Sequence, residues 1–160
     1  MPSTYTPIAT QTLGSAAASV TFSSISSAYT DLVLVVSGTV SADGAIRFRL
    51  NSDSGSNYSG TLLYGNGTNA TSVRGTSETT GALGRLGTVV STSIAQFMNY
   101  SNTTTNKTVI SRGNSSNAFV TAQVSLWRNT AAISTILLTP ESAANFDTGS
   151  TFTLYGIASA

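Results

Sequence analysis

Short runs in which apolar and polar residues alternate recur along the whole chain, and clusters of Gly, Asn, Ser and Asp separate them. Alternation places every second side chain on the same face of a strand, and its repetition between turn-forming clusters is typical of β-sandwiches and barrels. We therefore predict an all-β sandwich of about eight strands, with no helix longer than about two turns. Ten segments are candidates for these strands: 8–13, 19–22, 32–36, 45–50, 58–64, 93–100, 107–112, 119–127, 133–138 and 151–157.

The length and the absence of an internal repeat or linker favour one domain spanning residues 1–160. Residues 1–16 are expected to form an N-terminal strand or arm. Segment 66–86 has few apolar residues and contains Gly81 and Gly84, with Gly87 directly after it, so we predict a long, irregular excursion there. A connection of that length is usually functional or mobile, and it is the leading candidate for contact with another protein.

Four arginines are the candidate partner contacts. Arg74 and Arg85 lie on the predicted excursion, where guanidinium groups could pair with carboxylates or carbonyls of a neighbour. Arg47 and Arg49 alternate with apolar residues in segment 45–50, so they should share a strand face that meets water or a partner.

The predicted core follows from the apolar side of each run. The sequence LVLVV at 32–36 indicates a central strand buried on both faces. In segment 119–127, Val120, Ala122, Val124 and Leu126 are expected to point inward. Trp127 ends this run, and we expect its side chain to pack in the core or at an interface rather than to stack on a sugar. Four residues on the apolar sides of these runs are predicted to lie in the core: Leu34, Phe48, Val124 and Phe152.

Charged residues make up 8% of the chain, against about 25% in an ordinary soluble domain, and the net charge is +1. The basic residues are scattered, which argues against nucleic acid as a partner, because phosphate binding needs a clustered basic surface. A weakly charged surface gives little repulsion between copies, so self-association is easy. We expect no signal peptide, since a basic segment followed by an apolar one is missing, and no membrane span, since no apolar run approaches ~20 residues.

The chain has no histidine and no cysteine, so Ser-His and Cys-His catalytic groups, disulfides and thiol chemistry are excluded. A paired-carboxylate glycosidase remains open, because such a pair forms in space rather than in sequence. Calcium in the loop 51–57, NSDSGSN, also stays open, although the loop lacks the EF-hand pattern. We predict turn-forming roles for most acids, no enzyme activity, no metal and no cofactor.

Both ends of the chain resemble small virion proteins of tailed bacteriophages, especially phages of cyanobacteria and other marine hosts. The opening pattern is YTPIATQTLGSAAASVTFSSISSAYTDLVLVVSG and the closing one is ISTILLTPESAANFDTGSTFTLYGI, together covering roughly the first 65 and the last 30 residues. The resemblance is carried by Phe22, Ile25, Tyr29, Thr30, Asp31, Leu32, Gly149, Ser150, Phe152, Leu154, Tyr155 and Gly156.

That resemblance implies a jelly-roll β-sandwich and a role as a capsid decoration (cement) protein or as part of a fibre. A decoration protein would assemble in the host cytoplasm, form homotrimers on the capsid surface and bind the major capsid protein or another virion protein. The alternative is a tail or head fibre, or an adhesin module that binds a host-surface glycan.

Overall fold

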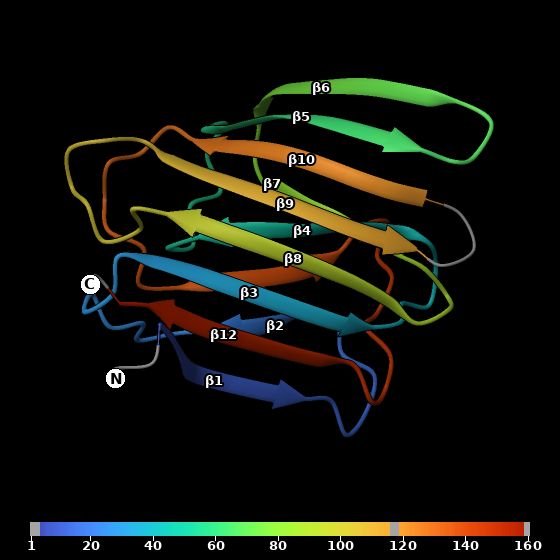
Figure 1. The fold of residues 1–160 in the computed structure, drawn as a ribbon, viewed down its shortest axis with the longest axis horizontal. Helices are drawn as coiled ribbons and strands as arrows, with labels where there is room; N and C mark the ends of the chain where they lie inside the picture. The colour runs from blue at the N-terminus through green and yellow to red at the C-terminus, as the bar shows by residue number, and fades with distance from the viewer. Residues whose placement is uncertain (1–3, 116–118, 159–160) are drawn as a thin grey trace.

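The computed structural model describes residues 4–115 and 119–158, which form two antiparallel sheets packed face to face (Figure 1). The larger sheet has eight strands in the order β1-β12-β3-β8-β9-β10-β5-β6, and the smaller has four in the order β2-β11-β4-β7. The strands are β1 Tyr5–Thr12, β2 Val20–Phe22, β3 Asp31–Gly38, β4 Gly44–Leu50, β5 Tyr58–Gly65, β6 Ala70–Glu78, β7 Gly81–Leu86, β8 Ser91–Met98, β9 Lys107–Ser115, β10 Phe119–Trp127, β11 Ile136–Pro140 and β12 Thr151–Ile157.

The predicted all-β, jelly-roll-like antiparallel sandwich is confirmed, but the number of strands is not. Twelve strands occur in the described residues, against about eight expected. The N-terminal segment is a strand rather than a free arm over residues 5–12, because β1 pairs with β12 along its length. The expected segments 93–100 and 107–112 overlap β8 and β9, which pair with each other as an antiparallel hairpin.

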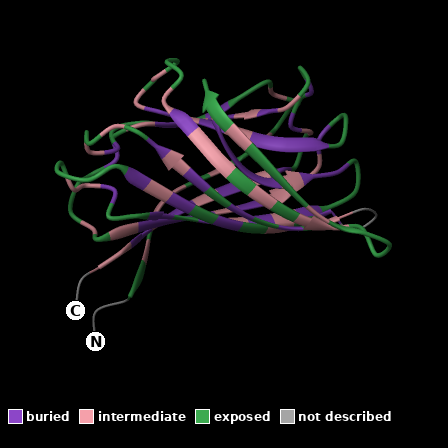
Figure 2. Cartoon of the chain, turned by 90° about the horizontal axis from the view of Figure 1, so that it is seen from above, coloured by how far each residue is buried: buried purple, intermediate pink, exposed green. Residues whose placement is uncertain are grey.

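The core lies between the two sheets, where buried positions alternate with exposed ones along most strands (Figure 2). Phe48 of β4 meets Phe97 of β8 edge to face, with ring centroids 5.8 Å apart. Phe152 of β12 meets Phe146 in the same way at 4.8 Å. Leu34, Phe48 and Phe152 are at most 1% exposed, so three of the four predicted core residues are confirmed.

The prediction for segment 66–86 is wrong, because it forms a short turn and two strands. β6 is polar because it is the edge strand of the large sheet and is exposed along most of its length. β7 is rich in glycine because other groups come too close for a side chain. A Cβ on Gly81 would lie 2.1 Å from Cζ of Phe48, and one on Gly84 would lie 3.1 Å from Cα of Gly113.

The prediction for the two faces of β10 is also wrong. Val120 and Val124 point outward and are 65% and 49% exposed, while Thr121, Gln123 and Ser125 are buried. β7 approaches β10 so closely that small hydroxyl side chains fit between them. The Ser125 hydroxyl donates to the Ala82 carbonyl at 2.8 Å and accepts the Ala82 N–H at 3.3 Å, which ties the two sheets together.

The loop 51–57 carries the chain from β4 in the small sheet to β5 in the large one, and Asp53 holds it in place. One oxygen of the Asp53 carboxylate accepts the Trp127 indole N–H at 2.7 Å, and the other accepts the Gly55 N–H at 2.8 Å. The Asn57 side-chain amide donates to both oxygens. Trp127 is 1% exposed and stacks on Tyr58, which confirms that it packs in the interior.

Candidate binding surfaces

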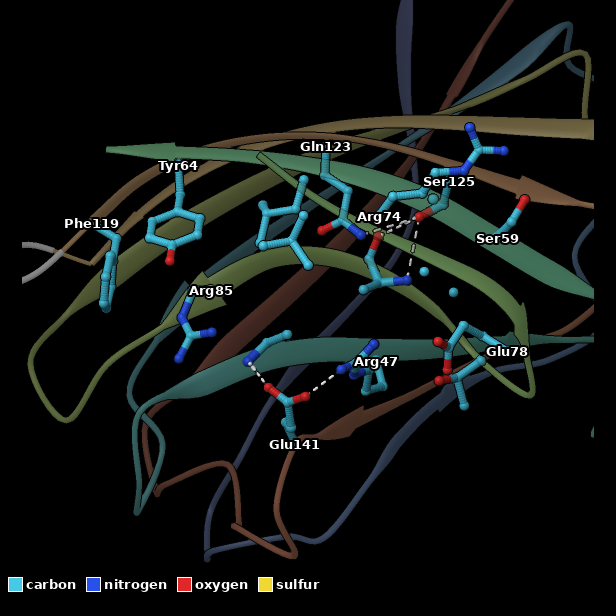
Figure 3. Close-up of a pocket in the computed structure, with 18 residues that line it drawn as sticks. Arg47, Ser59, Tyr64, Arg74, Glu78, Arg85, Phe119, Gln123, Ser125 and Glu141 are labelled. Carbon is cyan, nitrogen blue, oxygen red and sulfur yellow. Dashed lines mark hydrogen bonds and ion pairs between the residues drawn. The ribbon is translucent and has the colours of Figure 1, made fainter. Parts of the chain in front are cut away.

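A cleft lies where the small sheet ends and the large one continues. β7 is the edge strand of the small sheet and packs against β8, β9 and β10, whereas β5 and β6 of the large sheet extend beyond it. The space left between them has a volume of about 490 Å³ and is lined by residues of β4, β5, β6, β7 and β10 together with Glu141 (Figure 3). A concavity of this size lies within the range of small-molecule sites.

An ion pair forms one side of the cleft. The guanidinium of Arg47 donates to Oε1 of Glu141, and the Ala45 N–H donates to Oε2 at 3.1 Å. Burial alone would raise the pKa of the Glu141 carboxyl. The two hydrogen bonds and the charges of Arg47 and Arg85 outweigh burial, so the pKa lies below its ordinary value. Glu141 is therefore held as a carboxylate.

Arg85 also lines the cleft, and it forms no ion pair with a carboxylate of the described residues. Its guanidinium lies 5.0 Å from the centroid of the Phe119 ring, and Phe119 meets Tyr64 edge to face at 5.6 Å. The Arg85 Nε is buried and has no hydrogen-bond partner among the described residues. In Figure 3 the guanidinium of Arg85 lies below Phe119 and Tyr64, on the same side as the Tyr64 hydroxyl. The cation–π contact holds the cation in place without neutralising it.

The cleft brings together three of the four arginines that the sequence singled out. Arg47, Arg74 and Arg85 all line it, and Arg74 is exposed. Arg49 does not line it, and its Nε instead donates to the Thr79 carbonyl at 3.3 Å. Their role as partner contacts stays a prediction.

Sequence reasoning did not find the polar wall of the cleft. Gln123 and Ser125 of β10 and Tyr64 of β5 line it, and they reach it because β10 turns its polar face inward. A repeat of Thr, Gln and Ser at alternate positions, opposite a glycine-rich strand, was the signal available in the sequence.

The second surface is the outer face of β8, β9, β10 and β5, and we call it the apolar sheet face. Val124 pairs directly with Ile110, and Leu63 lies opposite Ala122. Within the described parts of these four strands, Arg112 is the one charged side chain on the outer face. The large apolar side chains of the face are each 40–65% exposed; they are Leu63, Met98, Ile110, Val120 and Val124.

The acidic residues of the described part of the chain do not gather into a metal-binding group. Among the described residues, no cluster of three or more Asp or Glu side chains could hold a metal ion. Both carboxylate oxygens of Asp53 already accept hydrogen bonds within the loop considered for calcium. Glu78 and Glu141 both line the cleft, and the hydrogen bonds from Arg47 and the Ala45 N–H hold Glu141 as a carboxylate.

Comparison with known proteins identified no relative of this chain. The chain matches no protein-family model, and no curated protein matches its sequence. Among the described residues, no helix has the length and apolar character needed to cross a membrane.

Proposed function

We propose that this protein is a non-catalytic structural protein of a tailed-bacteriophage virion. In this proposal it is a capsid decoration protein that forms homotrimers, binds major capsid subunits on the capsid surface and stabilises the head. The resemblance of its two ends to small phage virion proteins motivates the location, and the apolar sheet face supports the mode of action.

One observation carries the proposal: β10 buries Thr121, Gln123 and Ser125 and exposes Val120 and Val124. A strand whose outer face meets only water normally shows the reverse pattern. Five large apolar side chains gather on this face, and contiguous exposed apolar patches on soluble proteins mark interaction sites. The arrangement favours a protein whose large sheet is covered after assembly.

The charge distribution fits the same role. The apolar sheet face has little charge to desolvate, and the whole chain has a net charge of +1, so copies approach one another without strong repulsion. On a symmetric particle, many modest contacts add up through avidity, and no single contact has to be strong.

Replacing Val124 with Lys tests the proposal. A lysine at the centre of the apolar sheet face should turn trimers into monomers in sedimentation velocity and abolish binding to capsids that lack the protein. The matched control is Thr21→Lys, which adds the same charge at an exposed position of β2 on the small sheet. Trimers and capsid binding that survive in Val124→Lys as in Thr21→Lys would refute this role of the face.

The alternative is a fibre or adhesin module that binds a host-surface glycan, and the aromatic and polar lining of the cleft favours it. The number of copies per particle separates the two. A decoration protein should be present in on the order of hundreds of copies, and a fibre protein in at most a few dozen.

A further inference from the structure

We propose that the cleft between β7 and the overhanging strands β5 and β6 binds a sugar acid, with Arg85 pairing with its carboxylate. This site is separate from the apolar sheet face, and it does not depend on the virion role proposed above.

Arg85 supplies the anion-binding group. Its guanidinium lies on the face of Phe119 at 5.0 Å, and no described carboxylate or carbonyl accepts a hydrogen bond from it. A planar cation fixed against an aromatic ring and lacking an acceptor is preorganised for a planar, bidentate anion. A carboxylate has that geometry.

The balance of charge in the cleft decides which anion fits. Arg47 is neutralised by Glu141. Arg74 and Glu78, both exposed on β6, add one charge of each sign to the lining of the cleft without forming an ion pair. Arg85 is left as a surplus of one positive charge. A phosphate dianion would meet two carboxylates for one free cation, whereas a single carboxylate matches the surplus.

The rest of the lining matches hydroxyl groups. The Tyr64 hydroxyl and the Gln123 amide donate and accept hydrogen bonds, and the Glu141 carboxylate accepts them. Leu62 and Val73 add apolar surface on the same side as Gln123, because β10, β5 and β6 place the three side by side. Hydroxyl groups with an apolar ring face and one carboxylate describe a hexuronic acid, and 490 Å³ accommodates one such residue or a disaccharide.

The test is a titration of the full chain, labelled with ¹⁵N, with sodium galacturonate. Glucose tests the requirement for the carboxylate, acetate tests the requirement for the sugar, and inorganic phosphate and an acidic peptide test other anions. We expect saturable shifts of the Gly60, Gly75 and Gly81 amides with galacturonate, with at least about tenfold weaker binding of each of the other probes.

The variants assign the binding to the cleft. Arg85→Gln should weaken galacturonate binding at least about tenfold, and Tyr64→Phe, which keeps the ring, about threefold. Arg112→Gln removes the same charge from the outer face of β9 and should leave the dissociation constant within about twofold of the original. Val124→Lys should also leave it unchanged, which separates this site from the apolar sheet face.

Several results would overturn the proposal. These are the absence of saturable shifts, equal binding of glucose or acetate, tighter binding of phosphate or the acidic peptide, and unchanged binding in Arg85→Gln. If Arg85→Gln does not fold, Tyr64→Phe decides, and undiminished binding in that variant would also overturn the proposal.

Discussion

Replacing Asp53 with Ala should destabilise the protein well beyond the effect expected for a loop residue. The Asp53 carboxylate accepts hydrogen bonds from the Trp127 indole at 2.7 Å, the Gly55 N–H at 2.8 Å and the Asn57 amide at 2.9 Å. Hydrogen bonds to a charged group contribute about 1.5–3 kcal/mol each, and a buried donor left unpaired costs about 1–3 kcal/mol. Asp53 is partly exposed and the three bonds are not additive, so we expect a loss of about 2–4 kcal/mol.

That loss corresponds to a fall in the thermal midpoint of about 5–15 °C for a chain of this size. Urea unfolding is the more direct assay, because Trp127 is the single tryptophan and its fluorescence reports on the contact that is removed. Glu78→Ala is the matched control, since it removes the same charge from an exposed side chain with no hydrogen bond or ion pair among the described residues. Equal unfolding free energies for the two variants would refute the structural role of Asp53.

Three further predictions concern pH, the core and close packing. The hydrogen bond from the Trp127 indole holds the pKa of Asp53 below its ordinary value of 3.8. The ionised carboxylate therefore stabilises the fold above pH 3.8, and this stabilisation is lost as the pH falls further. Below pH 3.8 the free energy of unfolding should depend less on pH in Asp53→Ala than in the original protein. Phe48→Ala and Phe152→Ala should each cost about 3–5 kcal/mol in urea unfolding, whereas Val124→Ala, on an exposed face, should cost less than about 1 kcal/mol in the monomer. Gly81→Ala should lower the thermal midpoint by several degrees, because its Cβ would lie 2.1 Å from Cζ of Phe48; an unchanged midpoint would show that the ring moves aside freely.

The sequence predicts strands well where alternation is strong and both neighbours in the sheet are strands. The bounds of β10 and β12 agree with the predicted segments 119–127 and 151–157. Residues 32–36, with the pattern LVLVV, lie in β3 near the middle of the large sheet, between β12 and β8. In these segments the period of the alternation predicts the strand and its bounds, although in β10 it does not tell which face is buried.

The same reasoning failed where burial does not dictate residue type. β6 is an edge strand with exposed faces, so its composition resembles that of a loop. β7 is buried, but Gly81 and Gly84 stand where apolar side chains would otherwise mark it. In β10 the alternation was recognised but assigned to the wrong face, because a close approach between sheets favours Ser and Thr inside.

The cleft could not be predicted because it results from the unequal width of the sheets. β5 pairs with β10 in the large sheet, whereas β4, which precedes it in the chain, pairs with β11 in the small sheet. The local sequences of β4 and β5 do not predict this difference. The arginines were selected for their charge and for their places in segments 66–86 and 45–50. Three of them lie in one cleft because of strand pairings between residues far apart in the sequence.

The unequal sheets also link the two candidate surfaces. The small sheet ends at β7, which packs against β8, β9 and β10, and strands β5 and β6 extend beyond it (Figure 1). The cleft lies between β7 and these two strands. The close approach of β7 brings polar residues of β10 inward, and period-two alternation then forces Val120 and Val124 outward. A polar cleft on the inner face and an apolar face outside are therefore two results of one packing arrangement. A substitution that pushes β7 away from β10, such as a larger residue at Gly84, should disturb both surfaces together.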